Sequence, residues 1–389
     1  MRFSRRQMIE LDACTRCGEC FKWCCVSAED NSTVPHERIN TLRTFFKRRY
    51  GLRAKIFGAG ELLEEEVRKY SSNVYNCTLC GRCRVVCPVR IDLRNLWISM
   101  REGVVDDKNH PDQMELAKDS IEKQHNVLNY PNGERVAWLE YMDKPPEHMY
   151  LKEKAEVVYF VGCIASFSPA VQSIPESFVR ILDKAGVDFI LMGGEEWCCG
   201  FPLIGAGMKD EIEGLKEHNI ERVRKTGAKT IVFTCPSCYN TWINEYEIDI
   251  EKLHSTEFIK RLVDEGEIAL KEIRGKVTYH DPCDLGRNSG VFEAPRAIIK
   301  AIPGLNFREM EKNREKASCC GGGGDFEMID GDLAGDIAET LIDEAIETEA
   351  DRVVTACQQC VRMMAKAIKR KGSKIEVLDI TELIMEAMD

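Results

Sequence analysis

Short apolar runs alternate with helical stretches from residue 156 onwards. Residues 157–161, 187–191 and 230–234 are mostly apolar or β-branched, and each run is long enough for one strand. Between them, near 175–185 and 208–226, apolar residues recur with helical spacing. Short buried strands that alternate with helices are typical of α/β units with a parallel sheet. The pattern therefore predicts an α/β domain in this part of the chain.

The same layout occurs a second time, because residues 276–280 and 353–355 form similar runs. Cysteines that follow the predicted strands recur at a nearly constant interval. The interval is 120 residues from Cys163 to Cys283, 121 from Cys198 to Cys319, and 122 from Cys235 to Cys357. A constant interval indicates an internal duplication. We therefore expect two α/β domains, at 156–275 and 276–389, with their sites at the carboxyl ends of the strands.

The first 105 residues show a different, helical pattern. Two cysteine motifs are separated by 52 residues, in which apolar residues have helical spacing: Ile39, Leu42, Phe45 and Phe46, then Leu62, Leu63 and Val67. This predicts a helical ferredoxin-like domain at 1–105. Residues 106–155 are polar and contain the turn signals Tyr130-Pro131-Asn132-Gly133 and Pro145-Pro146, so they predict a linker with one or two short helices.

The composition of the chain argues against several classes of protein. The chain has 389 residues, 19 cysteines and a net charge of −11, which argues against general nucleic-acid binding. No apolar run is long enough for a transmembrane helix. Arg5-Arg6 superficially suggests an export signal, but Glu10 and Asp12 follow where an apolar stretch is required. Cysteines with ligand spacing in a chain of this size favour the reducing cytoplasm of an anaerobe over a disulfide scaffold.

Eighteen of the nineteen cysteines fall into four ordered sets. The first two sets each read C-x2-C-x2-C-x3-C, the spacing that holds cubane [4Fe–4S] clusters in ferredoxins, where the fourth cysteine of one motif ligates the other cluster. The predicted ligands are Cys14, Cys17, Cys20 and Cys87 for one cluster, and Cys77, Cys80, Cys83 and Cys24 for the other. Zinc sites are the alternative, which the third C-x2 step and the Cys87-Pro88 ending disfavour. Cys25 is predicted to be a buried free thiol, with a spare ligand or redox partner as the alternative.

The other two sets have five cysteines each and contain a Cys-Cys pair. They are Cys163, Cys198, Cys199, Cys235 and Cys238, then Cys283, Cys319, Cys320, Cys357 and Cys360. Five thiolates exceed the four that a cubane needs, and adjacent cysteines do not easily place both sulfurs on one iron of a cubane. The pattern suits an open, larger cluster.

These sets resemble the paired CCG domains of heterodisulfide reductases. The sequence around them reads Glu195-Glu196-Trp197-Cys198-Cys199-Gly200, Tyr279-His280-Asp281-Pro282-Cys283-Asp284-Leu285-Gly286-Arg287 and Cys319-Cys320-Gly321-Gly322-Gly323-Gly324. The order of domains is similar to that of the fused protein HdrD and of its relative DsrK. Asp284, where HdrD-type sequences commonly carry His, and Asn288-Ser289 favour the DsrK-like side.

The resemblance implies one or two noncubane [4Fe–4S] clusters on the CCG cysteines and cleavage of a disulfide beside them. The second set and His280 are the predicted catalytic residues; the first set holds a second noncubane cluster, or is degenerate, zinc-bound or cubane. His280, Asp281, Asp284 and Arg287 surround a ligand, where they protonate a leaving thiolate or, as we favour, hydrogen-bond the turn.

The chain has no G-x-G-x-x-G opening a helix, so no flavin or NAD site is expected and electrons come from a partner. The resemblance implies a membrane cytochrome b-type subunit that oxidises a quinol or methanophenazine, or another electron-donor subunit, at the cytoplasmic face of the membrane. The substrate is a disulfide or trisulfide of a small thiol cofactor or a DsrC-like protein. The alternatives are an electron-transfer subunit of a flavin-dependent glycolate, lactate or glycerol-3-phosphate dehydrogenase, and a cytosolic flavin-coupled heterodisulfide reductase.

Residues 38–55 are basic and amphipathic in an acidic chain, with seven cations among apolar residues. They predict either a surface for anionic lipid or a membrane partner, or a solvated helix face.

Overall fold

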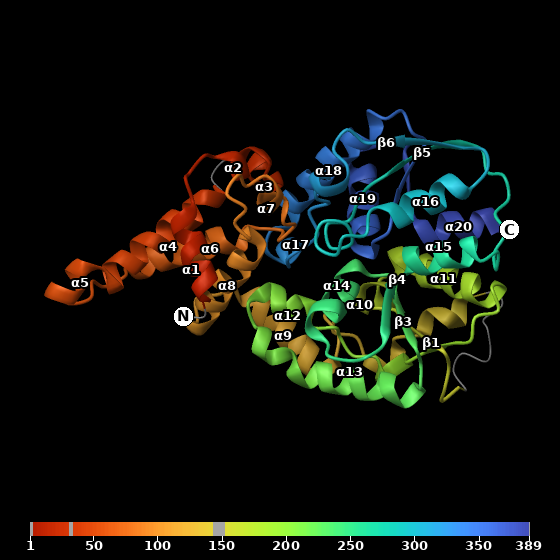
Figure 1. Cartoon of the computed structure of the whole chain (residues 1–389), viewed down its shortest axis with the longest axis horizontal. Helices are drawn as coiled ribbons and strands as arrows, with labels where there is room; N and C mark the ends of the chain where they lie inside the picture. The colour runs from red at the N-terminus through yellow and green to blue at the C-terminus, as the bar shows by residue number, and fades with distance from the viewer. Residues whose placement is uncertain (1–2, 31–33, 143–151, 389) are drawn as a thin grey trace.

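The structure, a computed structural model, describes residues 3–30, 34–142 and 152–388. A helical region at the start of the chain lies to one side of two α/β domains, and these domains lie against each other (Figure 1). This arrangement confirms the predicted fold class. Among the described residues, no helix combines the length and apolar character that crossing a membrane requires.

The first 106 residues form helices around a small core that includes Val74, Leu96 and Trp97. The short helices α2 and α7 follow the second cysteine of each ferredoxin-type motif, so the two motifs fold alike. The helices of this region are α1 (Arg5–Ala13), α2 (Glu19–Lys22), α3 (Cys25–Glu29), α4 (Pro35–Tyr50), α5 (Leu52–Phe57), α6 (Glu64–Tyr75), α7 (Arg82–Val85) and α8 (Leu93–Asp106).

In its described residues, the predicted linker contains one full helix, α9 (Asp112–Gln124), and two 3-10 turns, η1 (Asn132–Glu134) and η2 (Ala137–Tyr141). This segment packs against both of the parts that it connects. Met114 of α9 is buried in the core of the helical region, and Trp138 of η2 is buried in the core of the first α/β domain. Residues 143–151, which include the Pro145-Pro146 signal, lie outside the described residues.

The first α/β domain has a four-stranded parallel sheet in the order β2-β1-β3-β4. Its central strand β1 is fully buried, because helices cover both faces, and this explains the continuous apolar run. The strands are β1 (Val157–Phe160), β2 (Phe189–Leu191), β3 (Thr230–Phe233) and β4 (Glu251–His254). The helices are α10 (Cys163–Phe167), α11 (Ser173–Lys184), α12 (Phe201–Ala206), α13 (Glu213–Thr226), α14 (Pro236–Glu245) and α15 (Ser255–Asp264), with 3-10 turns η4 (Pro169–Val171), η5 (Gly193–Glu195) and η6 (Lys209–Ile212).

The second α/β domain repeats this topology, with a parallel sheet in the order β6-β5-β7-β8. The matching order bears out the predicted duplication. Its strands are β5 (Gly275–Tyr279), β6 (Leu305–Glu309), β7 (Arg352–Thr355) and β8 (Glu376–Asp379). Its helices are α16 (Glu293–Ala301), α17 (Phe326–Ile329), α18 (Gly331–Ile346), α19 (Gln358–Lys371) and α20 (Ile380–Met388), with the 3-10 turn η7 (Arg314–Lys316).

The two α/β domains meet through two equivalent helix pairs. Helix α11 packs on α20, and α15 packs on α16, so each domain contributes the same two helices of the repeat. Gln358, at the start of α19, reaches into the first domain, where its Nε2 donates to the Val161 carbonyl (3.0 Å) and to Thr234 Oγ1 (2.8 Å). The two domains therefore share one apolar core and face each other with approximate two-fold symmetry.

One buried guanidinium joins all three parts of the fold. Arg101 of α8 is fully buried and donates to the carbonyls of Cys77 (2.7 Å), Gly205 (2.7 Å) and Gly324 (2.8 Å). These carbonyls belong to the helical region, the first α/β domain and the second α/β domain respectively. The guanidinium thus satisfies backbone acceptors that would otherwise be left unpaired in the interior.

We expect Arg101→Met to lower the free energy of unfolding by about 3 kcal/mol, because several buried carbonyls lose a charged donor at once. The midpoint of anaerobic denaturant unfolding measures this effect. Arg68→Met is the matched control, since Arg68 is an exposed residue of α6 that pairs with Glu64 at the surface. Equal midpoints for the two variants would show that the Arg101 contacts do not stabilise the fold.

Candidate iron–sulfur centres and the cavity between the α/β domains

The first ferredoxin-type site is assembled from both motifs. Cys14, Cys17, Cys20 and Cys87 line one small cavity beside Trp97. Burial, and then the nearby Cys14 and Cys17 thiolates, raises the pKa of Cys20 to about 11. Thiols that repel one another when ionised are suited to a cation, which removes the repulsion. These are the four cysteines grouped in the sequence analysis, and their role as ligands stays a prediction.

A second group combines Cys77, Cys80 and Cys83 with Cys24 of the first motif. Burial raises the pKa of Cys83 well above its usual value, and the charges of Cys77, Cys80 and Cys24 add to that shift. Cys83 therefore lies among three other sulfurs, as the exchange of fourth cysteines between motifs predicts. In both groups the residues present fit a cubane, which needs four thiolates around one volume.

All ten CCG cysteines lie at or beyond the carboxyl ends of the parallel strands. Cys163 begins α10 after β1, and Cys235 caps α14 after β3; Cys283 and Cys357 follow β5 and β7 in the same way. The Cys-Cys pairs lie in loops that precede α12 and α17. This is the edge at which open parallel sheets form their sites.

Steric constraints require glycine as the third residue of each Cys-Cys-Gly triplet. Gly200 (φ +90°) and Gly321 (φ +84°) both have left-handed backbone, which a side chain disfavours. A Cβ on Gly200 would lie 2.8 Å from Ile212 Cγ2, and one on Gly321 would lie 2.3 Å from the Ala334 carbonyl oxygen. The turn after each cysteine pair therefore requires glycine, and this turn sets the direction of both sulfurs.

Nine of the ten CCG cysteines border a single cavity of about 250 Å³ between the two α/β domains. They are all five of the first set, Cys163, Cys198, Cys199, Cys235 and Cys238, and four of the second, Cys283, Cys320, Cys357 and Cys360. In the second set, the sulfurs of Cys320 and Cys360 are 3.2 Å apart. The five-cysteine sets thus face each other across one space rather than forming two separate pockets.

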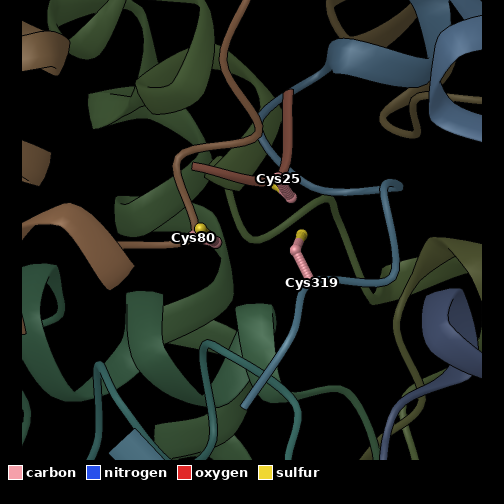
Figure 2. A group of neighbouring side chains, drawn as sticks. All are labelled: Cys25, Cys80 and Cys319. Carbon is pink, nitrogen blue, oxygen red and sulfur yellow. The ribbon is translucent and has the colours of Figure 1, made fainter. Parts of the chain in front are cut away.

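Cys319, the remaining member of the second set, lies elsewhere. Its Sγ, that of Cys80 and that of Cys25 all lie within 4.8 Å of one another, and Figure 2 shows the three side chains converging from three segments of the chain. Cys80 belongs to the second ferredoxin-type group. The second CCG set therefore touches the helical region directly, and Cys25 lies at the point of contact.

Three carboxyl groups line the cavity, and they differ in their partners. Asp284 accepts hydrogen bonds from Ser237 Oγ (2.7 Å) and Asn288 Nδ2 (2.8 Å) and pairs with Arg94. Glu327 pairs with Arg362 and accepts from Gln359 Nε2. Both carboxyl groups therefore have side-chain donors as partners.

Asp325 is the exception among them, because its Oδ2 is buried without a hydrogen-bond partner in the described part of the chain. Burial raises the pKa of Asp325 to about 7, although the charge of Arg101 opposes the shift. Sequence reasoning missed this residue, since one Asp after four glycines carries no recognisable signal.

The residues predicted around Cys283 separate in the structure. Asp281 is held by a buried, bidentate ion pair with Arg296 (2.7 Å), and Arg287 donates to the carbonyls of Cys80 and Ala317. The side chain of His280 has no such partners. Both of its ring nitrogens are buried without partners among the described residues, and it is not part of the cavity wall. Burial lowers the pKa of His280 to about 4. Its catalytic role stays a prediction.

A buried ion pair supports the first CCG set. Arg135 pairs with Glu196 (2.9 Å), whose carboxylate also accepts from the backbone N–H groups of Val161 and Gly162 (both 2.8 Å). The guanidinium reaches Cys163 Sγ at 3.7 Å. Glu196 therefore fixes the loop that carries Cys163, and Arg135 places a positive charge beside its sulfur. Glu196 lies within the Glu-Glu-Trp-Cys-Cys-Gly stretch, yet nothing in the sequence identified its partner.

Comparison with known families agrees with this interpretation of the fold and the sites. The family of cysteine-rich CCG domains matches residues 157–242 and 277–365, and a 4Fe-4S dicluster domain matches residues 10–91. Together these matches cover more than half of the chain. They define it as a CCG-domain iron–sulfur protein.

Individual relatives identify the family more narrowly than the domain matches do. The chain is 36% identical to the HdrD polypeptide of the dihydromethanophenazine:CoB–CoM heterodisulfide reductase of Methanosarcina barkeri, over 98% of this chain and 95% of that protein. The corresponding Methanosarcina acetivorans polypeptide is 35% identical over the same shares. The chain belongs to the HdrD family of heterodisulfide reductase polypeptides.

More distant relatives carry other names. The EtfAB:quinone oxidoreductase of Syntrophomonas wolfei is 30% identical over 100% of this chain and 59% of its own length. Among solved structures, a hypothetical protein from Helicobacter pylori has a TM-score of 0.60 at 12% identity, over 100% of this chain and 73% of that one, and this likeness shows the fold alone.

Proposed function

We propose that this chain is the catalytic iron–sulfur subunit of a heterodisulfide-reductase-like complex of the HdrD or DsrK type. It passes electrons from a membrane cytochrome b-type or quinol-type donor, through two cubanes, to noncubane clusters on the CCG cysteines, where a disulfide or trisulfide is reduced to thiols. The observation that carries the proposal is the shared cavity, because two cysteine-rich sets on opposite walls suit a substrate with two sulfur atoms.

The residues that would hold the clusters follow from the four groups described above. Cys14, Cys17, Cys20 and Cys87 would bind one cubane, Cys77, Cys80, Cys83 and Cys24 the other, and each five-cysteine set a noncubane cluster. When bound, these clusters supply the two electrons of disulfide reduction one at a time. The contact between Cys80 and Cys319 supports an order in which the second CCG set receives electrons before the first.

Reduction also consumes protons, because a disulfide, two electrons and two protons give two thiols. We assign one of these protons to the carboxyl group of Asp325, the cavity carboxyl with an unpartnered oxygen. Asp284 and Glu327 are each held by donors from neighbouring side chains, so we do not assign the proton to either of them. A pKa near 7 allows Asp325 to be protonated before the thiolate leaves and to be reloaded from solvent.

The thiol response of the oxidised holoprotein tests the proposed function. We expect about sixteen iron atoms per chain, for four [4Fe–4S] clusters, and a paramagnetic EPR signal that appears only with the correct thiol. Coenzyme M, coenzyme B and a DsrC-like protein are the thiols to compare. About eight irons and no thiol response would contradict disulfide reduction and would support an electron-transfer subunit of a flavin-dependent dehydrogenase.

The role of Asp325 predicts a specific pH dependence. The acid form is lost as pH rises through about 7, so kcat for disulfide reduction should fall above that pH. Asp325→Asn should lower kcat on the order of 100-fold and abolish this limb of the profile. Glu327→Gln is the control, because Glu327 lines the same cavity but is bound to Arg362. An unchanged profile in Asp325→Asn would exclude this residue as the proton donor.

Partner docking is proposed at the basic segment of the helical region. Some of its cations are used inside the protein, since Arg38 is buried and donates to the carbonyls of Asn73 and Asn76. The end of α4 and the whole of α5, which carry Lys47, Arg49, Arg53 and Lys55, extend away from the α/β domains (Figure 1). Within the described structure no ion pair involves Lys47, Arg49, Arg53 or Lys55, and the apolar side chains of Tyr50, Leu52, Ile56 and Phe57 are exposed beside them. Exposed apolar and cationic side chains together favour a contact at the membrane surface over a purely solvated face.

We expect Phe57→Glu to reduce the fraction of the protein that sediments with membranes from cells expressing the complex by at least fivefold. Leu116→Glu on α9 is the matched control, because Phe57 is 81% and Leu116 67% exposed. Binding to protein-free anionic vesicles would assign the contact to lipid rather than to the membrane partner. Equal sedimentation of both variants would exclude the segment as the docking site.

A further inference from the structure

Cys25 is the one cysteine that belongs to none of the four sets, and its surroundings are unusual. It is the first residue of α3 and follows the predicted ligand Cys24. Its Sγ lies within 4.8 Å of the sulfurs of Cys80 and Cys319, which come from the other ferredoxin-type motif and from the second α/β domain (Figure 2). Three sulfurs from three distant segments therefore meet where the two cofactor-bearing parts of the chain touch.

The position of Cys25 is fixed by packing rather than by the sulfurs alone. The next residue, Val26, is buried in the core of the second α/β domain together with Ile337 of α18. At the other end of α3, Thr340 Oγ1 donates to Glu29 Oε1 (2.7 Å). Helix α3 is thus docked on α18, and this docking holds the Cys25 thiol against Cys319.

A buried cation completes the site. Arg287 donates through Nε to the Cys80 carbonyl (2.8 Å) and through Nη1 to the carbonyls of Glu315 (2.7 Å) and Ala317 (2.9 Å). Its Nη2 is buried with no partner in the described part of the chain. A guanidinium with a free donor beside several sulfurs is an environment for thiolates, because it stabilises negative charge on them.

We propose that Cys25 is a positioning residue whose thiol donates a hydrogen bond to the ligand sulfur of Cys319, at the junction between the two centres. A donor stabilises the reduced form of a cluster more than the oxidised form, because reduction increases the negative charge on the sulfurs. Cys25 therefore raises the reduction potential of the centre on the second CCG set, which favours transfer from the helical region into that domain. This rests on the proposed ligand roles of Cys80 and Cys319.

Reduction potentials of the holoprotein, measured by EPR-monitored redox titration, test the inference without turnover. Cys25→Ala should shift the potential of the centre on the second CCG set to more negative values, with iron content unchanged. Cys25→Ser keeps a donor at the same place, so its potential should stay close to that of the wild type. If the potential shifts in Cys25→Ala but not in Cys25→Ser, the hydrogen bond and not the volume of the side chain causes the shift.

Ile375→Ala is the matched control, because Ile375 is buried in the same core as Val26 but lies outside both α3 and α18. It should lower stability and leave the potentials unchanged. The inference is overturned if Cys25→Ala has wild-type potentials, if Ile375→Ala shifts them equally, or if Cys25→Ala loses iron, since that loss would make Cys25 a ligand.

The two proposals fail in distinguishable ways. A chain that holds about sixteen irons but shows no thiol response contradicts disulfide reduction, whereas the Cys25-dependent shift is still measured on the same clusters. A chain with about eight irons has no CCG clusters, and this outcome overturns both proposals together. A normal thiol response with unshifted potentials overturns the role of Cys25 alone.

Discussion

The arrangement of this protein depends on how its interior accommodates the charge of Arg101. A buried guanidinium is tolerated only when its donors are used, and here the acceptors are backbone carbonyls of the helical region and of both α/β domains. Because these acceptors include the Cys77 carbonyl and lie close to the CCG loops, one side chain sets the spacing between the parts that carry the cysteine groups. The same charge lies near Asp325, so the anchor of the fold and the proposed acid of the cavity influence each other.

Cysteine spacing indicates which cysteines belong together, because ligand spacing is local and the duplication interval is visible in one sequence. The structure brings the first eight cysteines together in the two groups that spacing indicates, and their role as ligands stays a prediction. The shared cavity did not follow, since it depends on two domains facing each other through α11, α15, α16 and α20. The pairing of Arg135 with Glu196 joins residues far apart in sequence, and no pattern indicates it.

Strand prediction succeeded where strands are central and failed at some edges. The central strands β1, β3, β5 and β7 are mostly apolar or β-branched where they are buried, whereas the edge strands β4, β6 and β8 mix charged and apolar residues and are more exposed. The environment of His280 did not follow from its position in the sequence. Its place next to a predicted ligand suggested hydrogen bonding in the turn, but tertiary packing buries both ring nitrogens away from donors and acceptors of the described chain.

The basic end of α4 and α5 gives this acidic chain a pronounced electric asymmetry. With a net charge of −11, the molecule as a whole is repelled by an anionic surface, while the projecting cations are attracted to it. At physiological ionic strength such forces act over a Debye length of about 8 Å, so they turn the molecule before any side chain makes contact. At an anionic surface, the helical region that carries α4 and α5 would therefore arrive before the two α/β domains.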